Sequence, residues 1–179
     1  IAEDMARHGA GPVIHVGDLV DRGPDCRAVI NYLMQGIDEG RDWVVLKGNH
    51  DRMFARFLRD PNEPEPGLRA DLGYLNPKIG GAATLASYGV RNAADRPIPK
   101  IHADAIAAVP HSHRQFLESR PTLHQAGTCA FVHAGIRPGI ALADQTETDL
   151  VWIREPFLST TESHGPLIVH GHTALDRAT

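Results

Sequence analysis

Four segments of this sequence share one pattern, in which a short apolar run leads directly into a loop with a side chain suited to metal binding or proton transfer. The four loops lie at residues 17–23 (GDLVDRG), 48–51 (GNHD), 133–135 (HAG) and 171–173 (GHT). In α/β proteins the carboxyl ends of the strands lie at one edge of the sheet, where ligands bind. We therefore expect the four loops to meet at one edge of a sheet.

The composition limits the classes of protein to which the chain can belong. Its 179 residues, 42% of them hydrophobic, suit one globular domain with a substantial core. A formal net charge of -4 gives no general reason to bind nucleic acid or an anionic membrane, so we expect neither as a partner. No run approaches the ~18 apolar residues of a membrane helix. Two isolated cysteines are typical of a reducing compartment, and the cytoplasm is the expected location.

The apolar runs predict the main elements of an α/β fold. Strands, expected to be buried, are predicted at residues 12–16, 43–46, 128–132 and 166–169. Apolar residues at helical spacing predict a helix from Cys26 to Ile37 that stops at Gly40, and a further helix follows the second strand.

The order of these elements predicts how the chain is organised. Strand, helix and strand in succession form one βαβ unit, so the first two strands should be parallel. From about residue 61 to residue 125 the pattern is helical and irregular. We therefore predict a single domain over residues 1–179, with a helical cap inserted at about residues 61–128.

A set of oxygen and nitrogen ligands is predicted at the ends of the strands. The carboxylate of Asp18 can bridge two hard cations, although aspartate is also common in ordinary turns. Asn49 and His50 are adjacent and point in different directions, so one can bind a metal while the other faces a substrate. His133 and His172 would each be a core histidine in isolation. Together with Asp18 and Asn49 they form a set suited to Mn²⁺, Fe or Zn²⁺.

The same loops contain a candidate acid and a candidate phosphate ligand. His50 can protonate a leaving oxygen if a carboxylate orients its far ring nitrogen, and Asp21 is the predicted partner. Arg22 offers the two-pronged donor that phosphate recognition favours. A surface salt bridge is the alternative role for Arg22.

Other polar residues are assigned by their position in the chain. Arg154 is a candidate second phosphate clamp with Trp152 packed beneath it, and the alternative is a surface ion pair with Asp149 or Glu155. His170 is expected to lie next to the metal ligands without binding the metal itself. The His111 and His113 pair is interpreted as cap surface after a helix start at Pro110.

At these residues the sequence resembles the phosphoprotein phosphatase branch of the calcineurin-like metallophosphoesterases. The four loop motifs occur in the order typical of that family. Similarity to bacterial members extends to residues 80–89 (GGAATLASYG) and 150–155 (LVWIRE), so nearly the whole chain is covered.

The resemblance implies a fold, a reaction and a role for each motif residue. The fold would be a four-layer αββα sandwich. Two divalent metal ions, with manganese favoured over iron or zinc, would supply a metal-bound hydroxide that hydrolyses phosphomonoesters. By resemblance, the metal ligands are Asp18, Asn49, His133 and His172, His50 with Asp21 protonates the leaving group, and Arg22, Arg154 and Asn49 bind the phosphate.

One departure from the family pattern is important. The family's first motif, an Asp-x-His that completes the first metal site, is absent. A βαβ unit needs roughly 30 residues, so we expect the strand that carries this motif before Ile1. The family also continues beyond the position of Thr179. We therefore expect a chain truncated at both ends that is weakly active or inactive, with an active full-length parent.

Three functions are compatible with these motifs. Hydrolysis of phosphoserine, phosphothreonine or phosphotyrosine in proteins is favoured, because residues 20–23 resemble the protein-phosphatase form of the loop. A hydrolase of diadenosine tetraphosphate or another nucleotide is the second, since such enzymes share the other motifs but typically lack Asp21. A non-catalytic phosphate-binding module is the third, if the first metal site is truly absent.

Overall fold

The first part of the fold is a parallel pair of strands, β1 (Val13–His15) and β2 (Trp43–Val45), joined through helix α2 (Cys26–Asp38). The computed structural model describes residues 11–174. The sequence of residues 1–8, followed by Gly9 and Gly11, suggests the middle or end of a helix, and that segment lies outside the described residues. The parallel pairing confirms the predicted βαβ unit. Both strands are half-buried along most of their length rather than fully buried, which differs from the prediction.

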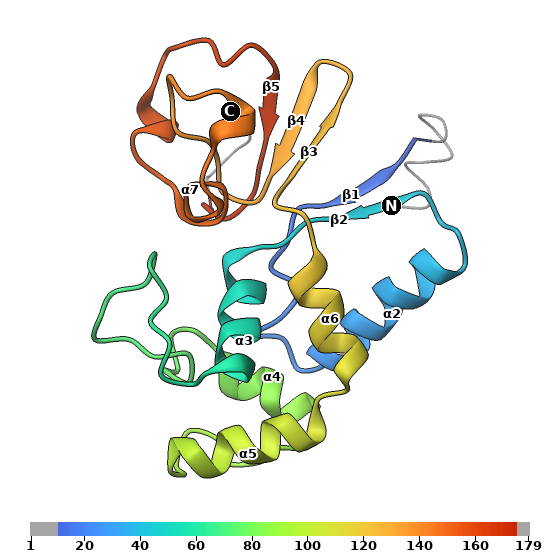
Figure 1. The fold of residues 1–179 in the computed structure, drawn as a ribbon, viewed down its shortest axis with the longest axis vertical. Coiled ribbons are helices and arrows are strands. Elements are labelled where there is room, and N and C mark those ends of the chain that lie inside the picture. Colours follow the sequence, from blue (N-terminus) through green and yellow to red (C-terminus); the bar gives the residue numbers. More distant parts are fainter. Residues whose placement is uncertain (1–10, 175–179) are drawn as a thin grey trace.

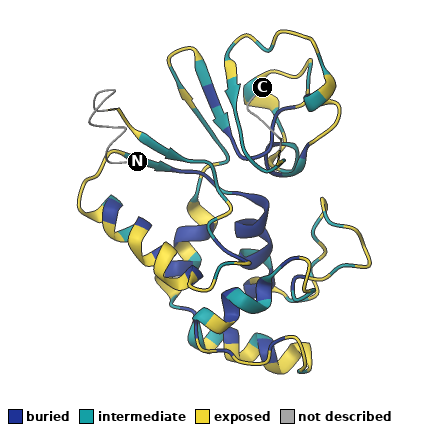
Figure 2. Cartoon of the chain, turned by 180° about the vertical axis from the view of Figure 1, so that it is seen from behind, coloured by how far each residue is buried: buried dark blue, intermediate teal, exposed yellow. Residues whose placement is uncertain are grey.

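Helix α2 follows its sequence pattern closely. The side chain of Asp25 caps its start by accepting a hydrogen bond from the Ala28 amide at 3.2 Å. Gly40 lies just beyond its end with φ +76°, a conformation that glycine adopts without steric cost. Figure 2 shows the helix with a buried stripe on one side and an exposed stripe on the other. The predicted amphipathic helix is therefore confirmed.

The second sheet contains one strand that the sequence pattern did not predict. Its order is β3 (Leu123–Ala126), β4 (Cys129–Val132) and β5 (Leu167–Val169), with β3 antiparallel and β5 parallel to β4. Only four residues long and without an apolar run, β3 carries little local signal and is fixed by its pairing with β4. Leu167 of β5 is 67% exposed, which again differs from the buried strand predicted.

The larger hydrophobic core is built mainly from helices. Helices α3 (Asn49–Arg59), α4 (Gly81–Ser87), α5 (Ile98–Ala108) and α6 (His111–Ser119) pack around one another and against α2. The fully buried apolar side chains of this core include Ile30, Phe54, Leu85, Ile101 and Leu117. In Figure 1 these helices lie below the strands, with α5 farthest from them. The segment after α3 thus contributes to the main core.

A second, smaller core lies beside the three-stranded sheet. Helix α7 (Glu147–Trp152) and the short 3-10 helices η1 (Leu142–Asp144) and η2 (Phe157–Ser159) surround it. Its buried members are Val132, Ala134, Ile136, Leu150, Val151, Ile153 and Phe157.

Among the described residues, no helix has both the length and the apolar character required to cross a bilayer.

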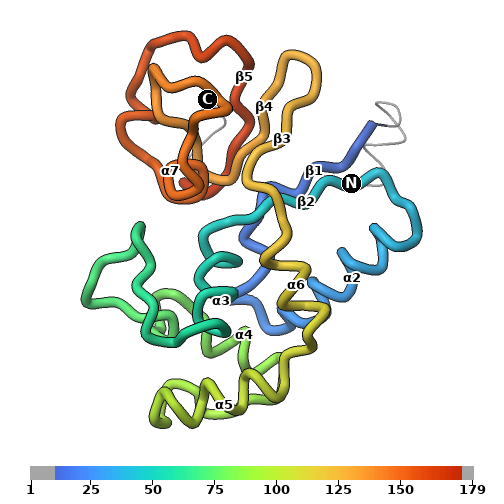
Figure 3. Tube along the Cα trace, viewed as in Figure 1, coloured from blue at the N-terminus to red at the C-terminus, as the bar shows by residue number. Residues whose placement is uncertain are grey.

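The predicted mixed α/β class is confirmed, and the strands form two sheets, as the expected αββα arrangement requires. The loops that follow β1, β2, β4 and β5 meet where the two sheets approach each other, as the chain trace in Figure 3 shows. Gly171 N donates to His133 O at 2.9 Å at the end of the second sheet, and Lys47 N donates to Pro121 O at 2.8 Å between the first sheet and the segment before β3. The expectation that the loops share one edge of a single sheet is therefore wrong in detail.

Candidate metal and acid–base site

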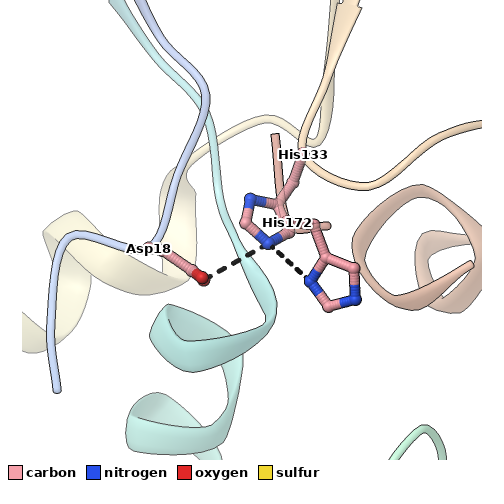
Figure 4. Close-up of side chains that lie close together, drawn as sticks. All are labelled: Asp18, His133 and His172. Atoms are coloured by element: carbon pink, nitrogen blue, oxygen red, sulfur yellow. Dashed lines mark hydrogen bonds and ion pairs between the residues drawn. The ribbon is translucent and has the colours of Figure 1, made fainter. Parts of the chain in front are cut away.

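Side chains from four segments far apart in the sequence converge at the junction of the two sheets. Asp18 Oδ1 lies 3.3 Å from His133 Nε2, and His172 Nδ1 lies 3.2 Å from the same nitrogen (Figure 4). Asn49 Oδ1 lies 2.8 Å from His133 Nε2 and 3.0 Å from His172 Nδ1. The ligand atoms of Asp18, His133 and His172 all lie within 4.8 Å of one another. All four predicted metal ligands are thus close enough to share one ion.

The protonation pattern of His133 indicates what this cluster can bind. Its Nδ1 lies 2.7 Å from the carbonyl oxygen of Val16, which can only accept, so Nδ1 carries the proton and Nε2 presents a lone pair. That lone pair faces the acceptor oxygens of Asn49 and Asp18. Acceptors directed at one point repel one another unless a cation lies between them. The donor set therefore fits a divalent metal ion.

Both histidines of the cluster favour the neutral form that binds metal ions. Burial lowers the pKa of His133, an effect that the carboxylate of Asp18 only partly offsets. Burial, followed by the neighbouring His133 and Arg154, lowers the pKa of His172 to about 4.

The loop after β1 is held in an unusual backbone conformation. Asp18, Asp21 and Arg22 have φ of 56°, 71° and 60°, and His172 has φ of 62°. In the described part of the chain only one other non-glycine residue, Asn92, has a positive φ. Strained conformations of this kind tend to cluster at functional sites, where surrounding contacts enforce them. The strain here coincides with the predicted site residues.

Asp51 makes the main contacts that hold this loop, although it was not among the predicted site residues. Its Oδ2 accepts hydrogen bonds from the amides of Asp18 at 2.9 Å and Gly48 at 2.8 Å, and its Oδ1 accepts one from Leu19 at 2.9 Å. Burial raises the pKa of Asp51 to about 7, against the effect of these amides. A carboxylate three residues into a helix, as in a capping box, was the available signal.

Asn49 and His50 lie in the first turn of α3, not in a loop as the motif pattern suggested. Gly48 precedes them in extended conformation and packs directly on the other loop. A Cβ on Gly48 would lie 2.4 Å from the Asp18 amide nitrogen, and one on Gly17 would lie 2.4 Å from the Gly48 nitrogen. This backbone contact allows Asp18 and Asn49 to approach each other, and only glycine permits it.

His50 and Asp21 form the predicted pair. His50 Nδ1 lies 2.6 Å from Asp21 Oδ2, and the side chains are 8% and 1% exposed. Desolvation lowers the pKa of His50, but the hydrogen bond to Asp21 and the charges of Asp18 and Asp21 together outweigh it and raise the pKa. The pair therefore has the geometry and electrostatics of a histidine held ready to donate a proton.

Two residues from the segment after α3 hold the other oxygen of Asp21. Tyr74 Oη donates to Asp21 Oδ1 at 2.8 Å, and Thr84 Oγ1 donates to the same oxygen at 2.7 Å. The Asp21 amide in turn donates to Thr84 Oγ1 at 2.8 Å. Neither residue was among the predicted site residues, because a tyrosine and a threonine 53 and 63 positions away give no local signal of this contact.

The two arginines among the predicted phosphate ligands are both exposed and belong to different parts of the fold. Arg22 Nη2 lies 3.4 Å from His50 Nε2, on the side of the ring opposite Asp21. Arg154 follows α7, and its charge contributes to the lowered pKa of His172. The surface pairings considered for Arg154 do not form among the described residues, since Asp149 pairs with Arg137 and Glu155 accepts from Ser159. Both guanidinium groups remain candidates for phosphate binding.

His170 and His113, the other histidines considered in the sequence, lie outside the cluster. His170 packs edge-on against Phe157, with ring centroids 5.0 Å apart. The interpretation of His113 as cap surface is wrong, because it is 4% exposed and lies 2.8 Å from Tyr88 Oη and 2.9 Å from Asn31 Oδ1. Helix α6 starts after Pro110 as predicted, and helical spacing alone did not reveal that it directs His113 inward.

Known proteins resemble the chain to different extents. No curated protein matches the chain. One solved structure, described as "Crystal structure of a putative diadenosine tetraphosphatase", is similar with 19% identity and a TM-score of 0.49. The similarity covers 84% of this chain and 51% of that one, so the chain spans about half the length of this relative. The sequence profile of the calcineurin-like phosphoesterases matches residues 5–178. The chain therefore belongs to the calcineurin-like phosphoesterase family.

Proposed function

We propose that the protein is a metal-dependent phosphomonoesterase whose centre is formed by Asp18, Asn49, His133 and His172. The observation that supports this most directly is the set of acceptor atoms around His133 Nε2, beside an acid–base pair. Members of the family generally use two divalent metal ions. Ions held by these residues would activate water and polarise the phosphoryl oxygens. Manganese is the metal we favour, with iron or zinc as alternatives.

The roles of the remaining residues follow from their positions. His50 protonates the leaving oxygen through Nε2, the ring nitrogen that does not contact Asp21. Asp21 fixes the ring orientation and stabilises the protonated form. Arg22 contacts Nε2 of His50, so a phosphate bound by its guanidinium would lie beside the acid. Arg154 and Asn49 complete the proposed phosphate ligands.

We favour phosphoserine or phosphothreonine in proteins as the substrate, with phosphotyrosine also included. Support comes from the loop at residues 20–23 and from the complete His50–Asp21 pair. The resemblance favours this choice, because diadenosine tetraphosphate hydrolases share the other motifs but typically lack the aspartate of this pair. We further propose that the cap at residues 61–128 influences the choice of substrate. Its Tyr74 and Thr84 already reach the acid–base pair.

A substrate panel tests this assignment. The complete gene product, loaded with Mn²⁺, is assayed against a phosphoserine peptide, a phosphotyrosine peptide, p-nitrophenyl phosphate and diadenosine tetraphosphate. We expect chelator-sensitive hydrolysis of the phosphopeptides. Cleavage of the dinucleotide without cleavage of either peptide or p-nitrophenyl phosphate would contradict the phosphomonoesterase assignment, but not metal-dependent hydrolysis of a phosphoryl group.

A metal-binding measurement separates catalysis from simple phosphate binding. Calorimetric titration with Mn²⁺ should show uptake that is lost in His133→Ala. If the protein takes up the ion but hydrolyses no member of the panel, the non-catalytic phosphate-binding module becomes the better description.

A further inference from the structure

Trp152 connects the proline-rich segment at residues 61–67 to the candidate metal ligand His172. It is the last residue of α7, and its indole ring lies edge-to-face with the His172 ring, with centroids 5.8 Å apart at 81°. On its other side, the indole Nε1 donates a hydrogen bond to Glu65 Oε1 at 2.7 Å. One side chain thus spans from the segment after α3 to the metal cluster.

Glu65 is itself held firmly in place. Its side chain is 5% exposed and pairs with Arg52, whose side chain is equally buried, and with Arg56 at 3.3 Å. A buried carboxylate requires such partners, because an unpaired charge is costly to remove from water. The backbone of Gly67 lies against the indole, where a Cβ would be 2.1 Å from Trp152 Cγ. The indole is therefore fixed both by a hydrogen bond and by close packing.

His172 depends on such packing more than the other histidine of the cluster does. A hydrogen bond from Nδ1 to the Val16 carbonyl orients His133. For His172, Nε2 is buried and has no hydrogen-bond partner among the described residues. Its backbone has φ 62°, outside any strand. Metal-binding histidines are usually oriented by a partner of the second ring nitrogen, and residues 11–174 provide no such polar partner for His172.

We propose that Trp152 is a positioning residue that keeps His172 Nδ1 directed at the metal cluster, and that Glu65 keeps Trp152 in place. This inference rests on the proposed metal site. It makes the segment at residues 61–67 part of the support of that site, although the segment contributes no ligand. The indole replaces the hydrogen-bonding partner that a metal-binding histidine normally has.

Calorimetric titration with Mn²⁺ tests the proposal without an activity assay. We expect Trp152→Phe to weaken binding about tenfold, because removal of a ligand's supporting partner typically costs 10- to 100-fold in metal affinity. Trp43→Phe is the matched control, since Trp43 is the other tryptophan and lies on β2 away from the cluster. It should bind the ion as tightly as the wild type.

Variants at Glu65 separate the hydrogen bond from the ion pairs. Glu65→Ala should weaken binding by a similar factor, whereas Glu65→Gln keeps an acceptor oxygen for the indole and should retain most of the affinity. Both residues act on His172 through one contact. The double variant Trp152→Phe/Glu65→Ala should therefore have the same Mn²⁺ affinity as whichever single variant binds Mn²⁺ less tightly. Circular dichroism identifies any variant that has lost its fold, and Glu65→Gln is the comparison if Glu65→Ala unfolds.

The outcomes are distinguishable. Equal Mn²⁺ affinity in Trp152→Phe and Trp43→Phe would overturn the positioning role and leave the metal site intact. Fully additive losses in the double variant would overturn the link through Glu65. A wild-type protein that binds no Mn²⁺ would overturn both this inference and the proposed function.

Discussion

His50 Nδ1 lies 2.6 Å from Asp21 Oδ2, and this contact joins the first turn of α3 to the strained loop after β1. Both side chains are nearly inaccessible to water, with exposed fractions of 8% and 1%. The other oxygen of Asp21 is held by Tyr74 and Thr84, so the carboxylate cannot rotate away from the imidazole without losing these bonds. The candidate acid is therefore positioned by three separate segments of the chain.

Replacing His50 tests its role as the acid. His50→Asn should lower kcat by about 10²- to 10⁴-fold, the usual contribution of general acid catalysis, while Mn²⁺ affinity stays unchanged. Steady-state kinetics and calorimetry measure the two effects. The exposed His111 provides a control, since His111→Asn should leave both quantities unchanged. A kcat for His50→Asn within a few-fold of the wild type would exclude the role.

Tyr74 should affect both the stability and the rate. Tyr74→Phe removes one donor from the buried Asp21, which should lower the free energy of unfolding by about 1–2 kcal/mol and lower kcat several-fold at constant KM. Tyr88→Phe is a matched control, because it removes a bond of the same length to His113 outside the site. It should reduce the stability, measured by urea denaturation, without changing kcat. Equal kinetic effects in the two variants would contradict this assignment.

Asp51 should be required for the shape of the metal-binding loop. Asp51→Asn offers one acceptor oxygen where the carboxylate serves three amides, so at least one buried amide of Gly48, Asp18 or Leu19 loses its partner. We expect a loss of about 1–3 kcal/mol in the free energy of unfolding and weaker Mn²⁺ binding. The exposed Asp71 allows a comparison by the same substitution, with no expected change. Unaltered stability of Asp51→Asn would argue against the capping role.

His113 should make the stability depend on pH. Burial, and then the charge of Arg27, lower its pKa below 6.5, so the unfolded state binds a proton at higher pH than the folded state does. Its stabilising contribution is therefore present above pH 6.5 and is lost as the pH falls below that value. Urea denaturation at pH 7 and pH 5 should show a smaller pH effect in His113→Asn than in the wild type.

The control for this pH effect is the exposed neighbour of His113. The substitution His111→Asn should leave the difference between the two pH values unchanged. An identical pH dependence in His113→Asn and the wild type would mean that His113 titrates alike in the folded and unfolded states.

The sequence was most informative where one short segment carries both the structure and the chemistry. Helix α2 was predictable from its apolar spacing and from Gly40 at its end, and the parallel pairing of β1 with β2 followed from the order of the elements. Asp18, Asn49, His133 and His172 were identified because each follows an apolar run, and the structure brings them together. Strand β3 was not predicted, since its pairing partner rather than its own residues defines it.

By itself, then, the sequence determined the chemical character of the loops, because metal ligands and acid–base groups can be recognised by type and spacing. Only the tertiary structure decided what supports them. The contacts of Asp51 with Asp18, of Tyr74 with Asp21 and of Glu65 with Trp152 join residues 33, 53 and 87 positions apart. Partners at such separations are set by how the helices and the two sheets pack. That packing depends on the whole chain, so no local pattern records it.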